Sequence, residues 1–254
     1  DIVPFKIQTL ELASTNPANY RGTCPIKEPL LDRMEEVEMG PPETLEEEIE
    51  IGLRNMYLTR REGKKPNIPY WHLRILARTV RYARDRAKHE VARRIESEPS
   101  CRATIKLYDH VQSKAIRQGR EVPLLADYGE SSEIVKLALV GRIEVEYGYT
   151  DKKAEVVERL LDEALNETCK EVYDQLPSDR FNEFYRELRG RGTDVDGGTY
   201  VPIELSIVQK LRMHEVVNSF VSKVSGVERT GDDLYLSTVD IILKSMTVCT
   251  PRYV

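Results

Sequence analysis

The chain has 254 residues, of which 40% are hydrophobic and 32% are charged, and its formal net charge at pH 7 is −5. This length and composition suit one large globular domain or two small ones, and they exclude a wholly disordered chain. No apolar run approaches the length of a membrane-spanning helix, so we predict no membrane insertion.

The N-terminal region, residues 1–42, contains six prolines and has little hydrophobic periodicity. Proline interrupts helices because it lacks a backbone N–H. We therefore predict an extended, Pro-rich arm that packs against another surface, such as that of a partner, or is mobile when the chain is isolated. Asp1–Phe5 has neither a basic start nor an apolar stretch, so we expect no signal peptide, and the missing initiator Met suggests a trimmed start.

Residues 43–189 are predicted to form a helical core. A first helix should begin near Thr44, which has capping-box spacing with Glu47. A long basic helix is predicted over 70–97, and apolar periodicity predicts further helices over 101–118, 132–140, 151–176 and 178–188. Residues 142–149 alternate apolar and polar side chains, as a strand does.

Residues 190–254 are predicted to form a C-terminal subdomain, which either stands alone or belongs to the same domain as 43–189. A glycine-rich loop over 190–199 should precede a helix over 202–225, a β-hairpin over 227–236 and a final helix over 238–246. The predicted fold class is therefore mostly α, a helix-rich α+β arrangement with a small β-hairpin element.

Charge is strongly segregated along the chain. Residues 28–50 contain ten acidic residues against Arg33 alone, whereas residues 54–94 contain 13 basic residues against three acidic ones. Such asymmetry between neighbouring segments indicates an interaction surface.

The basic segment supplies the candidate binding residues. Four of them share one flank of the predicted long helix and four precede it; they are Arg60, Arg61, Lys64, Lys65, Arg74, Arg78, Arg81 and Lys88. Cations at helical spacing near aromatic side chains are typical of surfaces that bind phosphate groups. Three interpretations stay open: the helix contacts RNA, it contacts an acidic segment of a partner or of this same chain, or it is a solvated helix. Arg84 lies near the apolar face, where we expect it to pair with a buried carboxylate.

The cysteines and histidines do not form metal-site motifs. The four cysteines lie far apart, with no C-x-x-C pair, which predicts free thiols. A zinc-protease helix needs a second His four residues after the first. The residue at that position is Arg93 after His89 and Asn218 after His214. We predict no metal and no cofactor, and a reducing intracellular compartment, either the cytoplasm or an organelle matrix after N-terminal processing.

Phosphate-binding loops and nucleophile elbows are also missing from the sequence. The pattern favours a non-catalytic structural or interaction subunit of a larger assembly, a ribonucleoprotein or nucleocapsid-like particle, which contacts RNA or an acidic protein partner through the basic helix. The alternative is a metal-dependent enzyme of nucleic-acid metabolism. In that case Asp127, Glu144 and Glu146 would lie near one Mg²⁺ ion, which two or three carboxylates can hold.

Overall fold

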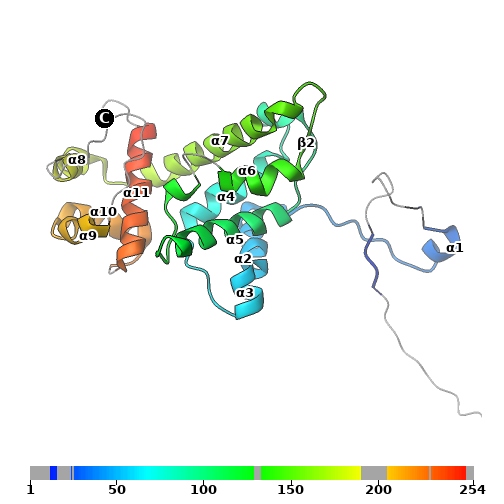
Figure 1. The fold of residues 1–254 in the computed structure, drawn as a ribbon, viewed down its shortest axis with the longest axis horizontal. Helices are drawn as coiled ribbons and strands as arrows, with labels where there is room; N and C mark the ends of the chain where they lie inside the picture. The colour runs from blue at the N-terminus through cyan, green and yellow to red at the C-terminus, as the bar shows by residue number, and fades with distance from the viewer. Residues whose placement is uncertain are drawn as a thin grey trace, which may run out of the picture. The chain divides into compact units, whose positions relative to one another are not determined.

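The structure is a computed structural model, and it describes residues 12–15, 24, 26–128, 133–189, 205–228 and 230–249. The loop predicted over 190–199 and much of the arm predicted over 1–42 lie outside these residues. The chain divides into two units, Asp1–Gly40 and Pro41–Val254. The mostly helical class with a small β element is confirmed (Figure 1).

The first unit contains one short helix among its described residues, α1 (Glu28–Leu31), which is a single turn. The described residues on either side of this turn, 26–27 and 35–40, have no regular secondary structure. All side chains from Ile26 to Gly40 are exposed.

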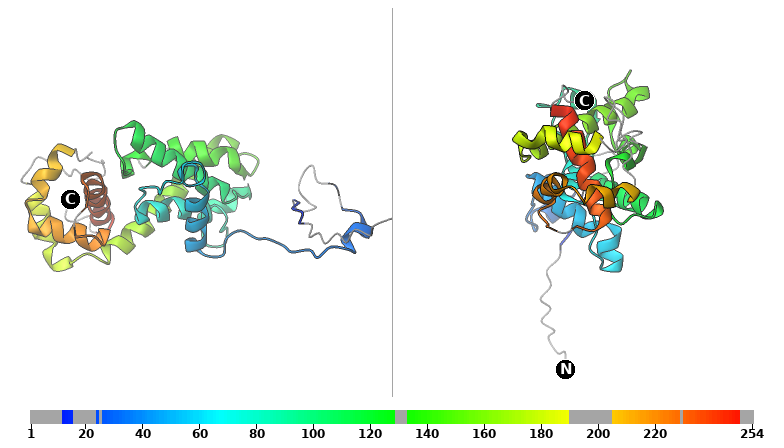
Figure 2. Two further views of the ribbon diagram at one scale, coloured as in Figure 1. Left: turned by 90° about the horizontal axis from the view of Figure 1, so that it is seen from below. Right: turned by 90° about the vertical axis from the view of Figure 1, so that its left-hand side faces the viewer.

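In the second unit, a first hydrophobic core lies among six helices: α2 (Leu45–Asn55), α3 (Tyr57–Glu62), α4 (Tyr70–Tyr82), α5 (Arg102–Arg117), α6 (Glu133–Leu139) and α7 (Lys153–Tyr173). The predicted capping box at the start of α2 is confirmed, because the Glu47 N–H donates to Thr44 Oγ1 at 3.1 Å. Helix α4 packs against α2, α5 and α7 (Figure 2). Most of its residues are buried.

A second core lies among α8 (Phe181–Arg189), α9 (Leu205–Leu211), α10 (Glu215–Ser225) and α11 (Asp232–Cys249). The rings of Phe184 and Phe220 stack there at 4.6 Å. Helix α11 joins the two cores, because Ile241 packs in the first and Val239 and Ile242 pack in the second. Figure 1 shows α11 beside the C-terminal end of α7.

The β element includes two residues of the strand predicted over 142–149, and its other strand lies in the segment predicted as the long helix. Strands β1 (Ile95–Ser97) and β2 (Glu144–Val145) pair antiparallel, with Ile95 opposite Val145. The helix predicted over 70–97 therefore ends at Tyr82. Residues 83–94 are rich in alanine and arginine, which favour a helix, so local propensity does not end α4 at Tyr82. Ile95 is instead buried in the strand pairing with Val145.

The hairpin predicted over 227–236 is wrong, because α11 already begins at Asp232. Acidic side chains at the start of a helix interact favourably with its dipole, so Asp232 and Asp233 suit a helix N-terminus as well as a turn. The helix predicted over 202–225 is interrupted at 212–214, where the Asn218 side chain donates to the Arg212 carbonyl at 2.7 Å.

The other predicted helices are confirmed within a few residues. Gly119 ends the helix predicted over 101–118 with a left-handed φ of 75°, which favours glycine. Within the described ranges, no helix combines the length and the apolar character needed to cross a membrane.

Close packing between α2 and α5 at Gly52 gives a first testable prediction. A Cβ atom at Gly52 would overlap the ring of Tyr108, which is fully buried and donates a hydrogen bond to the Leu73 carbonyl at 3.0 Å. Overpacking costs about 1–3 kcal/mol, which exceeds the gain of about 1 kcal/mol from helix propensity. We expect Gly52→Ala to lower the free energy of unfolding by about 1 kcal/mol in a denaturant titration.

The matched control is Gly141→Ala, because a Cβ there meets open space. We expect this control to keep the parent stability. Equal effects of the two substitutions would show that the Gly52–Tyr108 contact does not constrain the packing of α2.

Candidate functional site

The structure separates the eight predicted binding residues into two groups. Arg74, Arg78 and Arg81 lie on α4 and contact other parts of this chain. The remaining five lie on α3, in the loop after it and in the turn after α4, and their side chains are exposed; they are Arg60, Arg61, Lys64, Lys65 and Lys88.

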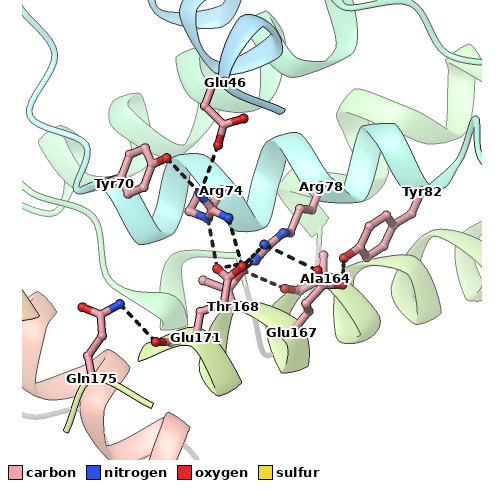
Figure 3. Close-up of polar contacts among 10 residues, drawn as sticks. All are labelled: Glu46, Tyr70, Arg74, Arg78, Tyr82, Ala164, Glu167, Thr168, Glu171 and Gln175. Carbon is pink, nitrogen blue, oxygen red and sulfur yellow. Dashed lines mark hydrogen bonds and ion pairs between the residues drawn. The ribbon is translucent and has the colours of Figure 1, made fainter. Parts of the chain in front are cut away.

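Arg74 and Arg78 share one carboxylate of α7, that of Glu171 (Figure 3). Arg74 donates from Nε and Nη2 to the two carboxylate oxygens, both at 3.0 Å. Arg78 donates to the same oxygens, one of them at 2.9 Å, and to Thr168 Oγ1 at 2.7 Å. Bidentate contacts of this kind are among the stronger hydrogen bonds in proteins.

The charges around Glu171 shift its protonation. Burial alone would raise the pKa of Glu171, but the hydrogen bonds and charges of Arg78 and Arg74 lower it below its usual value. The Tyr82 hydroxyl, at the end of α4, donates to Glu167, and His89, in the segment after α4, contacts Glu163 at 2.6 Å. Glu163, Glu167 and Glu171 follow one another at four-residue spacing, so they line the face of α7 that meets α4.

Two further arginines connect α4 to the start of α2. Arg81 donates to the carbonyl oxygens of Pro42, Glu43 and Thr44 at 2.8–3.0 Å. Arg84 pairs with Glu48, which is completely buried and also accepts a hydrogen bond from Thr104. The expectation that Arg84 pairs with a buried carboxylate is confirmed.

Pairing of the acidic segment with the basic helix within this chain is also observed. Glu46 contacts Arg74 at 3.3 Å, and Glu48 contacts Arg84. Much of the positive charge that the sequence assigns to 70–94 is therefore neutralised by α2 and α7. The cations of α3 and its following loop, together with Lys88, are the exposed part of the predicted basic surface.

The three acidic residues of the metal-site alternative each pair with a different cation. Asp127 is buried and accepts hydrogen bonds from Arg120 at 2.7 and 2.9 Å. Glu144 pairs with Lys153 at 3.3 Å and Glu146 with Arg94 at 3.7 Å. Across the described residues, no three His, Cys, Asp or Glu side chains are grouped as a metal ion would require. All four cysteines are free.

A buried polar cluster, which no sequence motif predicts, joins α4, the segment 120–128 and α11. His72 Nδ1 lies 2.5 Å from the Tyr128 hydroxyl, and Nε2 lies 2.8 Å from Ser237 Oγ. A serine beside an imidazole can act as a nucleophile. Here both side chains are fully buried, so the pair lies in the interior, where its hydrogen bonds join the helices. The members of the cluster lie up to 165 residues apart, which is why spacing does not reveal them.

Asp240 of α11 belongs to the same region and accepts a hydrogen bond from the Leu125 N–H at 2.8 Å. Burial raises the pKa of Asp240 to about 7, and the nearby negative charge of Asp127 acts in the same direction. Burial also lowers the pKa of His72 to about 3, so the imidazole stays neutral in the folded chain.

Comparisons with known proteins found no matching family model, no matching curated protein and no matching solved structure. The function is therefore inferred from the residues and contacts of this chain.

The shared carboxylate of Glu171 gives a second prediction. Glu171→Gln should lower the free energy of unfolding by about 2 kcal/mol near neutral pH, because Arg78 loses a charged acceptor while it stays buried. The lowered pKa of Glu171 stabilises the fold above the ordinary Glu pKa, and this stabilisation disappears as the pH falls. The difference from the parent should therefore shrink in acid.

Glu155→Gln is the matched control, since Glu155 lies on the same helix and forms an exposed pair with Arg159. Its effect should stay within about 0.5 kcal/mol. Denaturant titrations over a pH series measure both variants, and a Glu171→Gln effect as small as that of the control would contradict the structural role of the carboxylate.

Asp240 gives a third prediction, in which stability depends on pH in the direction opposite to that expected for Glu171. Its raised pKa means that the folded state holds a proton that the unfolded state releases, so stability decreases as the pH rises from the ordinary Asp pKa to above 7. Asp240→Asn should remove this decrease, making the variant progressively more stable relative to the parent between pH 5 and pH 8. Asp151→Asn, an exposed control, should follow the parent, and parallel curves for all three chains would contradict the assignment.

Proposed function

We propose that this chain is a non-catalytic interaction subunit of a larger assembly, and that residues 26–39 form the segment that binds a protein partner. The observation that carries the proposal is the exposure of six large apolar side chains within these residues: Ile26, Leu30, Leu31, Met34, Val37 and Met39. Clustered exposed apolar side chains are unusual on a monomeric protein and mark interaction sites.

The spacing of these side chains suggests how the segment binds. Leu30, Met34 and Val37 follow the i, i+4, i+7 pattern of the apolar face of a helix. Helix α1 already forms one turn, at Glu28–Leu31. Extension of this turn on binding would place the three side chains in a row. Exposed segments of this kind often become ordered when they bind.

The charge of the segment defines the partner's chemistry. Between the apolar positions stand five acidic residues, Glu28, Asp32, Glu35, Glu36 and Glu38, against two basic residues, Lys27 and Arg33. A complementary surface would be an apolar groove bordered by lysine and arginine, because opposite charges favour encounter and fix orientation.

The internal pairing of α4 also bears on this proposal. Arg74, Arg78 and Arg81 already contact acidic side chains and carbonyl oxygens of this chain. An external partner would have to replace those contacts, and breaking a buried pair is costly. We therefore assign protein binding to the exposed residues 26–39 and not to α4.

The proposal predicts a selective loss of partners. A chain carrying Leu30→Ser, Leu31→Ser and Met34→Ser should fold with the parent's thermal stability, because these side chains are exposed. It should lose the proteins that co-purify with the tagged parent from cells that express it naturally. Sedimentation velocity of the purified chains would show whether the partner is a second copy.

A matched control carries Leu137→Ser, Tyr147→Ser and Met213→Ser, which remove three exposed apolar side chains from the second unit. The control should retain every partner. If the 30–34 variant retains the same partners as the parent and sediments identically, residues 26–39 are not the binding segment.

A further inference from the structure

A cationic surface remains exposed on α3 after the arginines of α4 are paired. We call Tyr57, Arg60, Arg61, Lys64 and Lys65 the α3 basic surface. Tyr57, Arg60 and Arg61 have the i, i+3, i+4 spacing of one helix face, and the two lysines follow directly. With Glu62 as the one acidic residue between 57 and 65, this stretch carries a net charge of +3.

The positive charge of this surface is largely available to a ligand. All four cations are exposed, and only Lys64 pairs, with Glu62 at 2.8 Å. Within the described part of the chain, the side chains of Arg60, Arg61 and Lys65 form no ion pair. This arrangement contrasts with α4, where Glu171 and the carbonyls before α2 already occupy the guanidinium groups.

The helix that carries the surface is firmly attached to the first core. Met56, directly before α3, is fully buried, and the Tyr57 N–H donates to Asp109 of α5 at 2.7 Å. At the other end Gly63 adopts a left-handed φ of 65°, and the Lys64 N–H donates to the Leu58 carbonyl at 3.1 Å. Both ends of α3 are thus anchored, so its exposed face is held in place before any ligand binds.

Tyr57 distinguishes this surface from a purely electrostatic one. The residue is 59% exposed although it is aromatic, and it lies one turn from Arg60 and Arg61. Proteins bind single-stranded nucleic acid through two elements. Cations contact the phosphates of the nucleic-acid backbone, and an aromatic ring stacks on a base. An acidic peptide would use the cations but has no base to stack on the ring.

We propose that the α3 basic surface binds single-stranded nucleic acid, with phosphates on Arg60, Arg61, Lys64 and Lys65 and one base stacked on Tyr57. A base paired within a duplex cannot stack on a side chain in this way. Binding should be insensitive to sequence, since contacts to phosphate and to the face of a base carry little sequence information. This activity does not depend on residues 26–39, so either proposal can fail without the other.

Fluorescence anisotropy with labelled oligouridylate and oligothymidylate tests the proposal on the full chain. The triple variant Arg60→Glu, Arg61→Glu, Lys64→Glu should bind at least about tenfold more weakly than the parent. The parent's affinity for oligouridylate should fall by about 0.7 log units per contacted phosphate for each tenfold increase in salt, with a smaller slope for the variant. Comparison of the two oligonucleotides distinguishes RNA from DNA as the ligand.

The matched control reverses three exposed cations elsewhere, through Lys152→Glu, Arg159→Glu and Lys170→Glu. Both triple variants change the net charge equally, so only a local site separates them, and the control should bind within about twofold of the parent. Tyr57→Ala should weaken binding roughly fivefold or more, whereas Tyr147→Ala, which removes another exposed tyrosine, should not. Circular dichroism and thermal melting confirm that each variant is folded.

Three outcomes would overturn the proposal. The first is that the parent binds neither oligonucleotide. The second is that the control variant weakens binding as much as the α3 variant does. The third is that polyglutamate competes with the oligonucleotides while Tyr57→Ala has no effect. The last result would make the surface a docking site for an acidic protein. Loss of RNA binding with partners retained would leave the assignment of residues 26–39 untouched.

Discussion

The fold depends on how the chain buries a helix that carries arginine. Helix α4 lies in the first core between α2, α5 and α7, yet Arg74 and Arg78 lie on the side that meets α7. A buried guanidinium needs acceptors, because an unpaired charge in the interior is very unfavourable. Glu171 supplies them for both arginines at once, and Glu167 and Thr168 complete the set. Helix α4 can therefore be buried in the first core because the acidic face of α7 supplies partners for its arginines.

Buried polar side chains also need partners at the start of α2 and beside the second core. Arg81 and Arg84 tie α4 to the carbonyls before α2 and to the buried Glu48. His72 connects α4 to Tyr128 and to Ser237 of α11, which also packs along α7. Polar contacts thus position helices that hydrophobic burial alone would leave free to slide, since apolar packing is not directional.

Two exposed surfaces among the described residues are not used in these contacts. The acidic, apolar segment 26–39 and the basic face of α3 carry opposite charge, and neither is needed to build the two cores. An assembly subunit that binds a protein through one surface and a single strand through the other would use both. The separation of the two surfaces in sequence allows each to be altered without unfolding the chain.

The amino-acid sequence by itself determined the helical class, the capping box at Thr44 and the helices over 101–118 and 151–176, because periodicity and caps are local properties. Only the tertiary structure decided that the helix beginning at Tyr70 ends at Tyr82, because residues 83–94 are themselves rich in helix formers. The chain then leads to Ile95, which pairs with Val145, some fifty residues away along the chain. The tertiary structure also decided which cations stay exposed. Arg60 and Arg74 look alike in sequence, but the acceptors that occupy Arg74 stand on α7, about a hundred residues later. Helical spacing shows which side chains share a face, whereas the partner that covers this face is set by packing between distant segments.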